Sequence, residues 1–342
     1  MANNIFKEFD PFLETIGLLI ASHDMKKTKK EAIKTFNEHG FDGEKFYANN
    51  MGVFEKYVKE FKNHCSLSEK DTFFFDSNDS DFIAVLSFLV IPNRDLITSI
   101  DEIDNSEIYK ALIEICEYGL GMKVDFEQFD SLDDIISFLD TSDFQEGDKW
   151  KMMRLMQSPK KYIKQFINII NSNIKAYEKA EKSIRAELSK LLEKYYESVT
   201  DKDNGQFLKL KESLTETANI YPTLALPLSQ LVFEDNCYYG LFASIILGEE
   251  SDKKSKEKLI YGLKALSDKS KLQILQSLKK SPKYNLEIAN ELELTAPTMS
   301  HHMNVLLTCG FVGVDKKNGR VYYHLEEESI RLFLDALQKV LL

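Results

Sequence analysis

The amino-acid sequence predicts a mainly α fold built from two domains, with minor β content. Three observations predict it: a long heptad pattern after Pro159, a highly charged segment at residues 248–258, and a closing region in which helical and strand-like patterns alternate. We therefore expect a mostly helical N-terminal domain over residues 1–250 and a smaller C-terminal domain over residues 251–342.

Length and composition exclude several classes of protein. The 342 residues fit about two domains of ordinary size, and an apolar content of 43% is above that of disordered chains. The longest apolar stretches span about ten residues, whereas a membrane helix needs about 20. The N-terminus has acids within its apolar stretch, unlike a signal peptide. Four cysteines without a CxxC motif favour reduced thiols, so we expect a cytoplasmic protein.

Charge is distributed unevenly along the chain, whose net charge is −11. Residues 253–342 contain 15 Lys and Arg against 10 Asp and Glu, a net charge of +5, whereas residues 1–252 carry −16. A basic module on an acidic chain predicts that the C-terminal end binds a polyanion and that the N-terminal body repels it. The alternative is that the positive charge of the C-terminal segment arose by chance.

Apolar periodicity and turn-forming glycines predict a series of helices in the N-terminal domain. Their expected ranges are residues 6–21, 30–39, 46–61, 106–119 and 131–139. Ser131 precedes acidic residues and is a candidate N-cap for the last of these helices. Residues 71–92 fit either strands or short helices. Residues 218–247, which include Pro222 and Pro227, predict short strands or buried loops.

The longest pattern begins at Ser158-Pro159, where a cap residue precedes a proline at the first helical position. Apolar residues then recur at alternating spacings of four and three as far as Tyr195, with one interruption at Glu181. A helix over residues 159–198 would be about 60 Å long. It can be a spine inside its own domain or a coiled coil between protomers. We favour the spine, because Asn171-Ser172-Asn173 can bend the helix.

After the charged segment, the patterns follow the order helix, helix, short helix, helix, hairpin, helix. Asp268, Asn285 and Thr295 are candidate N-caps, and Gly310 is a candidate helix stop. Asn318-Gly319 joins two strand-like stretches and is the strongest short signal for a hairpin. This order predicts a winged helix-turn-helix domain, in which the helix after Thr295 would enter the major groove of DNA.

The helix that begins after Thr295 has the two faces that a recognition helix needs. The apolar face, expected in the core, holds Met299, His302, Met303 and Leu306. The other positions carry candidate base-reading side chains, namely Thr298, Ser300, His301 and Asn304, because hydroxyl, imidazole and amide groups bond base edges. In the wing we expect phosphate contacts from Lys316, Lys317 and Arg320. The alternative for these residues is a solvated surface without DNA contacts.

The same residues carry a resemblance to a known family. The stretches LKALSDKSKLQILQSL, YNLEIANELELTAPTMSHHMNVLLTCGFV and VDKKNGRVYYHL resemble the DNA-binding domain of the ArsR family of bacterial transcriptional regulators. Residues 299–303 match that family's recognition helix. The resemblance covers about 85 of the 342 residues. It implies a sequence-specific DNA-binding regulator, and because the family mostly represses, it favours a repressor.

The resemblance also bears on metals and catalysis. Many family members sense metals through paired Cys or Asp/His ligands, but the helix over residues 286–292 has no Cys or His, and the last helix has Asp335 and no His. We therefore expect no metal site and no cofactor. No GxGxxG, GxxxxGK[ST], HExxH or GxSxG motif occurs, so we also expect no enzymatic activity.

Together these observations lead to the hypothesis of a homodimeric repressor that binds double-stranded DNA at an inverted-repeat operator, because paired half-sites need two recognition helices. The apolar stripe of the last helix is the candidate dimer interface: Ile330, Phe333, Leu334, Leu337 and Leu341. The N-terminal domain would sense a small-molecule effector or add dimer contacts. Two alternatives remain open, an enzyme domain fused to a DNA-binding tail and a winged-helix protein–protein adaptor.

Overall fold

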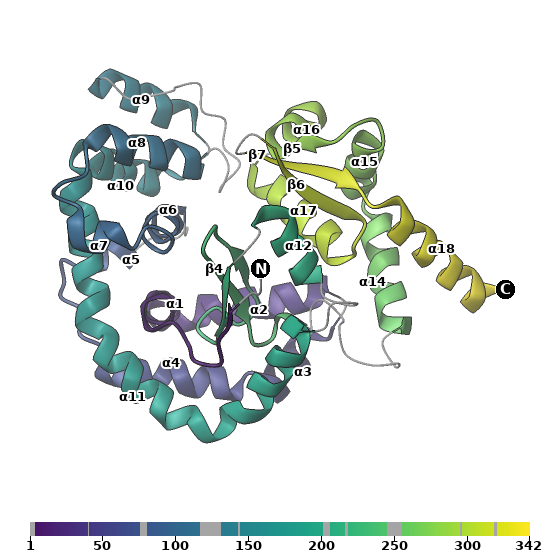
Figure 1. The fold of residues 1–342 in the computed structure, drawn as a ribbon, viewed down its shortest axis with the longest axis horizontal. Helices are drawn as coiled ribbons and strands as arrows, with labels where there is room; N and C mark the ends of the chain where they lie inside the picture. Colours follow the sequence, from purple (N-terminus) through teal and green to yellow (C-terminus); the bar gives the residue numbers. More distant parts are fainter. Residues whose placement is uncertain are drawn as a thin grey trace.

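The computed structural model describes residues 4–39, 41–75, 81–116, 131–142, 144–200, 206–215, 218–244, 255–294, 296–317 and 320–342. Helices dominate this part of the chain, and the strands form two small sheets (Figure 1). The predicted mainly α fold with minor β content is therefore confirmed.

Buried apolar side chains form separate cores in the two ends of the chain. The largest core draws on residues 9–243, and two smaller clusters draw on residues 261–312. We call the described residues up to 244 the N-terminal unit and those from 255 onward the winged-helix unit. The predicted domain boundary at residue 250 lies outside the described residues and stays a prediction. Among the described residues, no helix is both long and apolar enough to span a bilayer.

The N-terminal unit is built mainly from helices. They are α1 (Pro11–His23), α2 (Met25–Glu38), α3 (Gly43–Asn50), α4 (Gly52–His64), α5 (Thr72–Phe75), α6 (Asp81–Val90), α7 (Asp95–Ser99), α8 (Asn105–Glu114), α9 (Leu132–Thr141), α10 (Glu146–Gln157), α11 (Pro159–Thr200) and α12 (Gln206–Leu214). The ambiguous segment 71–92 thus contains α5 and α6. The N-cap predicted at Ser131 is confirmed as a capping box with Asp134.

Three predicted helices of this unit have different bounds in the structure. The helix expected over residues 30–39 is α2, which begins at Met25 because the Asp24 carboxylate caps it by accepting from Lys27 N at 2.9 Å. The single helix expected over residues 46–61 is divided into α3 and α4 at Met51, whose buried side chain packs in the core. The helix expected from Phe6 begins only at Pro11, because the Asp10 carboxylate caps it by accepting from Phe12 N at 2.9 Å. The end of the helix expected over 106–119 lies outside the described residues.

Helix α11 is the spine that the heptad pattern predicts. Its apolar stripe packs along α1 and α4 within the N-terminal unit, and Figure 1 shows it curving around the other helices. Asn173 is buried in this stripe and binds the α4–α5 connection, because its amide accepts from Ser66 N at 2.8 Å and donates to Ser66 O at 3.1 Å. Asn173, one of the three residues that we expected to bend the helix, therefore anchors it to this connection.

A four-stranded sheet lies at the centre of the N-terminal unit. Its order is β1 (Asn4–Ile5), β2 (Asn219–Thr223), β4 (Asn236–Gly240) and β3 (Gln230–Val232). The first three strands are parallel, and β3 is antiparallel to β4. Short strands predicted within residues 218–247 are thus confirmed, whereas β1, which lies just before the first expected helix, was not predicted.

Glu14 of α1 ties this helix to the segment that follows β2. Its fully buried carboxylate accepts from the Thr223 hydroxyl, from Tyr57 OH at 2.9 Å, and from the backbone N–H groups of Leu224 and Ala225, each at 3.1 Å. Burial nevertheless dominates and raises the pKa of Glu14 to about 7. These four donors make the carboxylate a structural link between α1, α4 and the sheet.

The winged-helix unit has the predicted order of elements. They are α14 (Ser255–Ser267), α15 (Lys269–Leu278), β5 (Lys283–Tyr284), α16 (Asn285–Leu292), α17 (Ala296–Thr308), β6 (Val312–Lys317), β7 (Arg320–Leu325) and α18 (Glu327–Leu341). The strands form an antiparallel sheet in the order β5-β7-β6, of which β5 was not predicted. Helix α14 begins at Ser255, inside the segment that we expected to be a linker.

Local signals explain most boundaries in this unit. Asp268 caps α15 as predicted, because its carboxylate accepts from Lys271 N at 2.9 Å. Gly310 follows α17 with φ 69°, the left-handed conformation that glycine adopts without strain. Asn285 is not the cap of α16 but its first residue, and Tyr284 occupies the cap position. Thr295 and Asn318-Gly319 lie outside the described residues.

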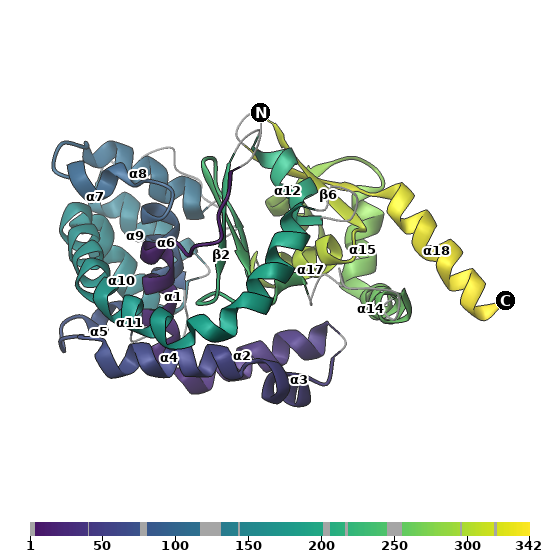
Figure 2. The same ribbon diagram turned by 60° about the horizontal axis from the view of Figure 1, so that its bottom comes forward.

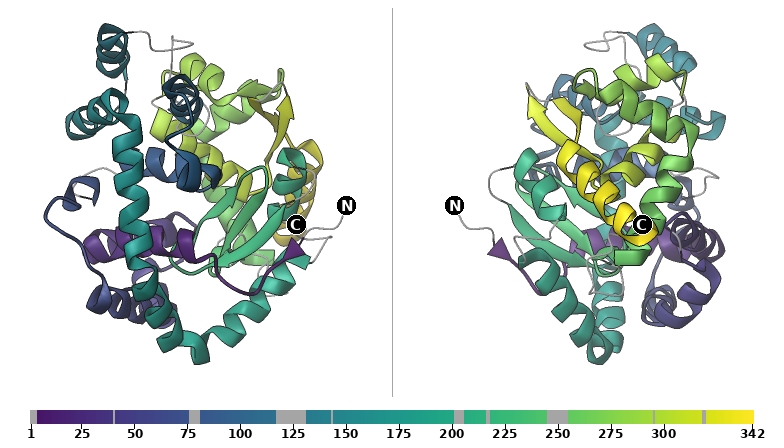
Figure 3. Two further views of the ribbon diagram at one scale, coloured as in Figure 1. Left: turned by 60° about the vertical axis from the view of Figure 1, so that its left-hand side comes forward. Right: turned by 90° about the vertical axis from the view of Figure 1, so that its right-hand side faces the viewer.

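The two units meet along α12 and α17. Helix α12 packs against β3 of its own unit and against β6 of the wing, and it lies between the two sheets in Figure 2. The views in Figure 3 show the same arrangement from two other sides. Helix α18 instead projects away from the N-terminal unit (Figure 2). This arrangement places the candidate recognition helix next to the N-terminal unit.

Candidate nucleic-acid interface

One side of α17 is buried in the winged-helix core. Met299, Met303 and Leu306 are at most 1% exposed and pack with apolar side chains of α15 and α16. His302 is also buried, and this burial lowers its pKa, which favours the neutral ring. The apolar face predicted from the sequence is therefore the core face of the helix.

The other side of α17 carries a polar stripe, which we define as His301, Asn304 and Thr308. Spacings of three and four residues place these side chains on one side of a helix. Asn304 is exposed, and 42% of the His301 side chain is exposed. Thr308, which we did not predict, donates its hydroxyl to Asn304 O at 2.7 Å. Thr298 lies about one helical turn before His301 and is exposed. The side chain of Ser300 is not among those that the structure describes.

The wing strands place the three predicted cations at the tip of the hairpin. Lys316 is exposed near the end of β6, paired in register with Val321 of β7. Lys317 pairs in register with Arg320 at the last rung before the turn. The side chains of Lys317 and Arg320 are outside the description, so the backbone alone places them. Cations at a hairpin tip suit contacts to phosphates beside a groove.

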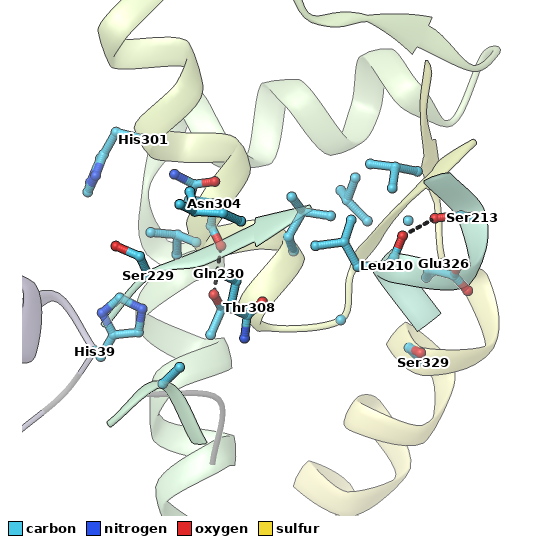
Figure 4. A pocket seen from close by; sticks show the side chains of 18 of the residues that line it. His39, Leu210, Ser213, Ser229, Gln230, His301, Asn304, Thr308, Glu326 and Ser329 are labelled. Carbon is cyan, nitrogen blue, oxygen red and sulfur yellow. Dashed lines mark hydrogen bonds between the residues drawn. The ribbon is translucent and has the colours of Figure 1, made fainter. Parts of the chain in front are cut away.

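A cavity of about 800 Å³ separates the polar stripe of α17 from the N-terminal unit (Figure 4). Ser229 and Gln230 lie opposite Asn304 and Thr308 in this view. At one end of the cavity, His301 Nε2 lies 3.8 Å from Glu38 Oε1. The lining includes the acids Glu38, Glu212, Asp315 and Glu326, and no Lys or Arg is among the described residues that line it.

His39 forms an aromatic contact between the two units. Its ring stacks on Tyr261 of α14 with centroids 5.0 Å apart and an interplanar angle of 16°. His39 Nδ1 also lies 2.8 Å from Thr35 O. Burial in this contact lowers the pKa of His39, so the packed ring is preferentially neutral. Sequence reasoning missed His39, because nothing in its local pattern distinguishes it from other histidines at helix ends.

Only part of the predicted interface stripe of α18 is exposed, and the other part packs in the winged-helix core. Ile330 and Phe333 pack against the winged-helix core, and the Phe333 ring lies 5.1 Å from that of Phe311. Leu334 and Leu341 are 51% and 70% exposed, and Leu337 is half-buried. The neighbouring α14 exposes Ile260 and Leu263. The outer part of the stripe is thus open to solvent, and its role as a dimer interface stays a prediction.

The strongly shifted carboxylate of the N-terminal unit does not favour the enzyme alternative. Glu14 is 0% exposed, and protein donors occupy both of its oxygens, so a substrate has no access to it. Among the described residues, no group of three or more His, Cys, Asp or Glu is arranged to hold a metal ion. The expected absence of catalysis and metal binding stays a prediction.

The winged helix, its two-faced helix α17 and its basic wing define a DNA-binding transcription regulator. Residues 268–314 match the family model described as bacterial regulatory protein, arsR family. The chain belongs to this family, as comparison with curated relatives also shows.

Two of these relatives come from Bacillus subtilis (strain 168). The uncharacterized HTH-type transcriptional regulator YbzH is 30% identical over 90 residues, which cover 22% of this chain and 90% of the relative. The transcriptional repressor SdpR is 30% identical over 80 residues, which cover 22% of this chain and 89% of that relative. No solved structure matches the chain. Each match therefore covers about a fifth of this chain and most of the relative's length.

Proposed function

We propose that this protein is a homodimeric transcriptional repressor that binds an inverted-repeat operator and that its N-terminal unit controls binding in response to an effector. The observation that carries the proposal is the polar stripe of α17, which lies opposite a fully buried apolar stripe and beside a wing with cations at its tip. The similarity to SdpR, a transcriptional repressor, supports repression over activation.

Each predicted contact has a distinct role in this proposal. Asn304 has the amide that bonds adenine through two hydrogen bonds, and His301 can donate to or accept from a base edge. Thr298 and Ser300, nearer the start of the helix, would bond bases or phosphates. Lys316, Lys317 and Arg320 would contact phosphates and supply affinity without reading sequence. We expect base-reading and phosphate-binding variants to differ in their dependence on salt.

Replacing the base-reading side chains should remove specific binding while leaving nonspecific binding in place. For His301→Ala and Asn304→Ala we expect about 10- to 100-fold weaker binding to a labelled duplex from the region upstream of the protein's own coding sequence, because a good base contact contributes about 1–3 kcal/mol. Their affinity for a duplex of random sequence should change little. Fluorescence anisotropy at several salt concentrations measures both affinities.

The controls separate readout from charge and from folding. Lys316→Ala should weaken binding to both duplexes and lower the salt slope by about one. His64→Ala, at an exposed histidine of α4, should bind like the wild type. If His301→Ala weakens binding to both duplexes equally, or weakens neither, then α17 does not read the base sequence. Repression itself is tested by a reporter behind the same upstream region, whose expression should rise when the gene is deleted.

A further inference from the structure

The polar stripe of α17 faces the protein itself. His301, Asn304 and Thr308 all line the cavity between the two units, and Figure 4 shows His301 and Asn304 directed toward the side on which His39, Ser229 and Gln230 lie. The opposite side of α17 is buried in the winged-helix core. The side that would enter a DNA groove is therefore the side that the N-terminal unit covers.

This cover leaves no room for a duplex. The major groove is about 12 Å wide, and a helix with its side chains is about 10–12 Å across, so a recognition helix fills the groove. Here Glu38 Oε1 lies 3.8 Å from His301 Nε2, and α12 packs against the wing strand β6. A cavity of about 800 Å³ holds a small molecule at most. The duplex can reach α17 only after the N-terminal unit has moved.

Charge acts in the same direction as the steric block. The cavity is lined by the four acids named above, and no Lys or Arg is among its described lining residues. Residues 1–252 carry a net charge of −16. Phosphates that approach α17 in this arrangement meet like charge, and the Glu38 carboxylate occupies a position beside His301 that a DNA acceptor would otherwise take.

We propose that this arrangement is an autoinhibited state, in which the N-terminal unit covers the DNA-reading side of α17 and must separate from it before DNA binds. The inference rests on the proposed function. The apolar cores of the two units are separate, so the units can part without opening either core. An effector would relieve or reinforce the block by binding the closed and open arrangements with different affinity.

Two acidic substitutions on the N-terminal unit test the proposal. His39→Glu places a carboxylate against Tyr261, and Leu210→Glu places one where α12 packs on the wing. Each adds negative charge, which by itself weakens DNA binding, so tighter binding reports only the release of the block. With the full chain, we expect each variant to bind the labelled upstream duplex and a random duplex about tenfold or more tightly than the wild type does.

His64→Glu is the matched control. His64 Nδ1 lies 3.0 Å from the carbonyl oxygen four residues earlier, as His39 Nδ1 does at 2.8 Å, but His64 is at the end of α4 and does not line the cavity. This variant should bind DNA equally to the wild type or more weakly. Small-angle X-ray scattering without DNA should give a larger radius of gyration for His39→Glu and Leu210→Glu, and no change for His64→Glu.

The outcomes separate this inference from the proposed function. Autoinhibition is overturned if the wild type binds DNA and both acidic variants, shown to be folded by circular dichroism, bind it no more tightly. In that case the proposed DNA-binding function still stands. If neither the wild type nor any variant binds either duplex, both autoinhibition and the proposed function are overturned. Because His39 and Leu210 belong to different elements, a folding defect in one variant leaves the other to decide.

Discussion

Replacing Glu14 by leucine should lower the free energy of unfolding of the N-terminal unit by about 3–5 kcal/mol. The substitution removes the acceptor for two hydroxyl donors and two backbone N–H groups that have no access to water, and unpaired buried donors cost about 1–3 kcal/mol each. Urea denaturation followed by circular dichroism measures the loss. Glu8→Leu, at an exposed glutamate of the same N-terminal segment, should change stability by less than about 1 kcal/mol.

Glu14 should also make stability depend on pH. Its pKa is about 7 in the folded chain against an ordinary value of 4.5, so the folded state binds the proton more tightly than the unfolded state does. The resulting stabilisation is complete below pH 4.5 and is lost as pH rises through 7, a change of about 3 kcal/mol. Glu14→Gln, which cannot titrate, should lack this component. Identical pH profiles for the two proteins between pH 4.5 and 8 would show that burial does not raise this pKa.

The second large effect concerns the outer stripe of α18. The double substitution Leu334→Asp with Leu341→Asp should convert the protein from a dimer to a monomer of 39.5 kDa and weaken operator binding by about 100-fold or more, because one protomer then reads only a half-site. Two carboxylates in an apolar interface leave buried charges without partners. Size-exclusion chromatography with light scattering gives the mass, and anisotropy gives the affinity.

Leu332 supplies the control for this experiment. It is 63% exposed on the same helix but lies about 160° around the axis from Leu334, since successive residues are 100° apart. Leu332→Asp should remain dimeric. A wild-type chain that is monomeric at the concentrations where it binds DNA, or a double variant that still dimerises, contradicts the assignment of this face.

The winged-helix unit could be predicted from sequence because its signals are local. Asp268 lies directly before α15, and Gly310 lies two residues after the end of α17, so each acts within a few residues of chain. The alternation of core and surface positions on α17 also follows from spacing alone. The same logic found the long helix α11 and the capping box at Ser131. Local patterns did not reveal β5, because a strand of two residues is too short to show an alternation of apolar and polar residues.

The N-terminal unit was harder to predict because its sheet depends on distant pairings. Strand β1 pairs with β2 through Asn4 and Asn219, which are 215 residues apart, and two residues of β1 show no periodicity. The cover over α17 depends likewise on Glu38 and His301, which only the folded chain brings together. Spacing correctly identified the polar side of α17, but it contained no information about what lies opposite that side.

Labelling of histidines by diethyl pyrocarbonate, with and without saturating operator duplex, tests the central claim most directly in the wild-type protein. The account predicts that DNA slows labelling of His301, which enters the groove, speeds labelling of His39, which leaves Tyr261, and does not affect His64. If DNA binds and His301 is labelled faster than in its absence, the duplex uncovers α17 without occupying its polar side and the account is wrong.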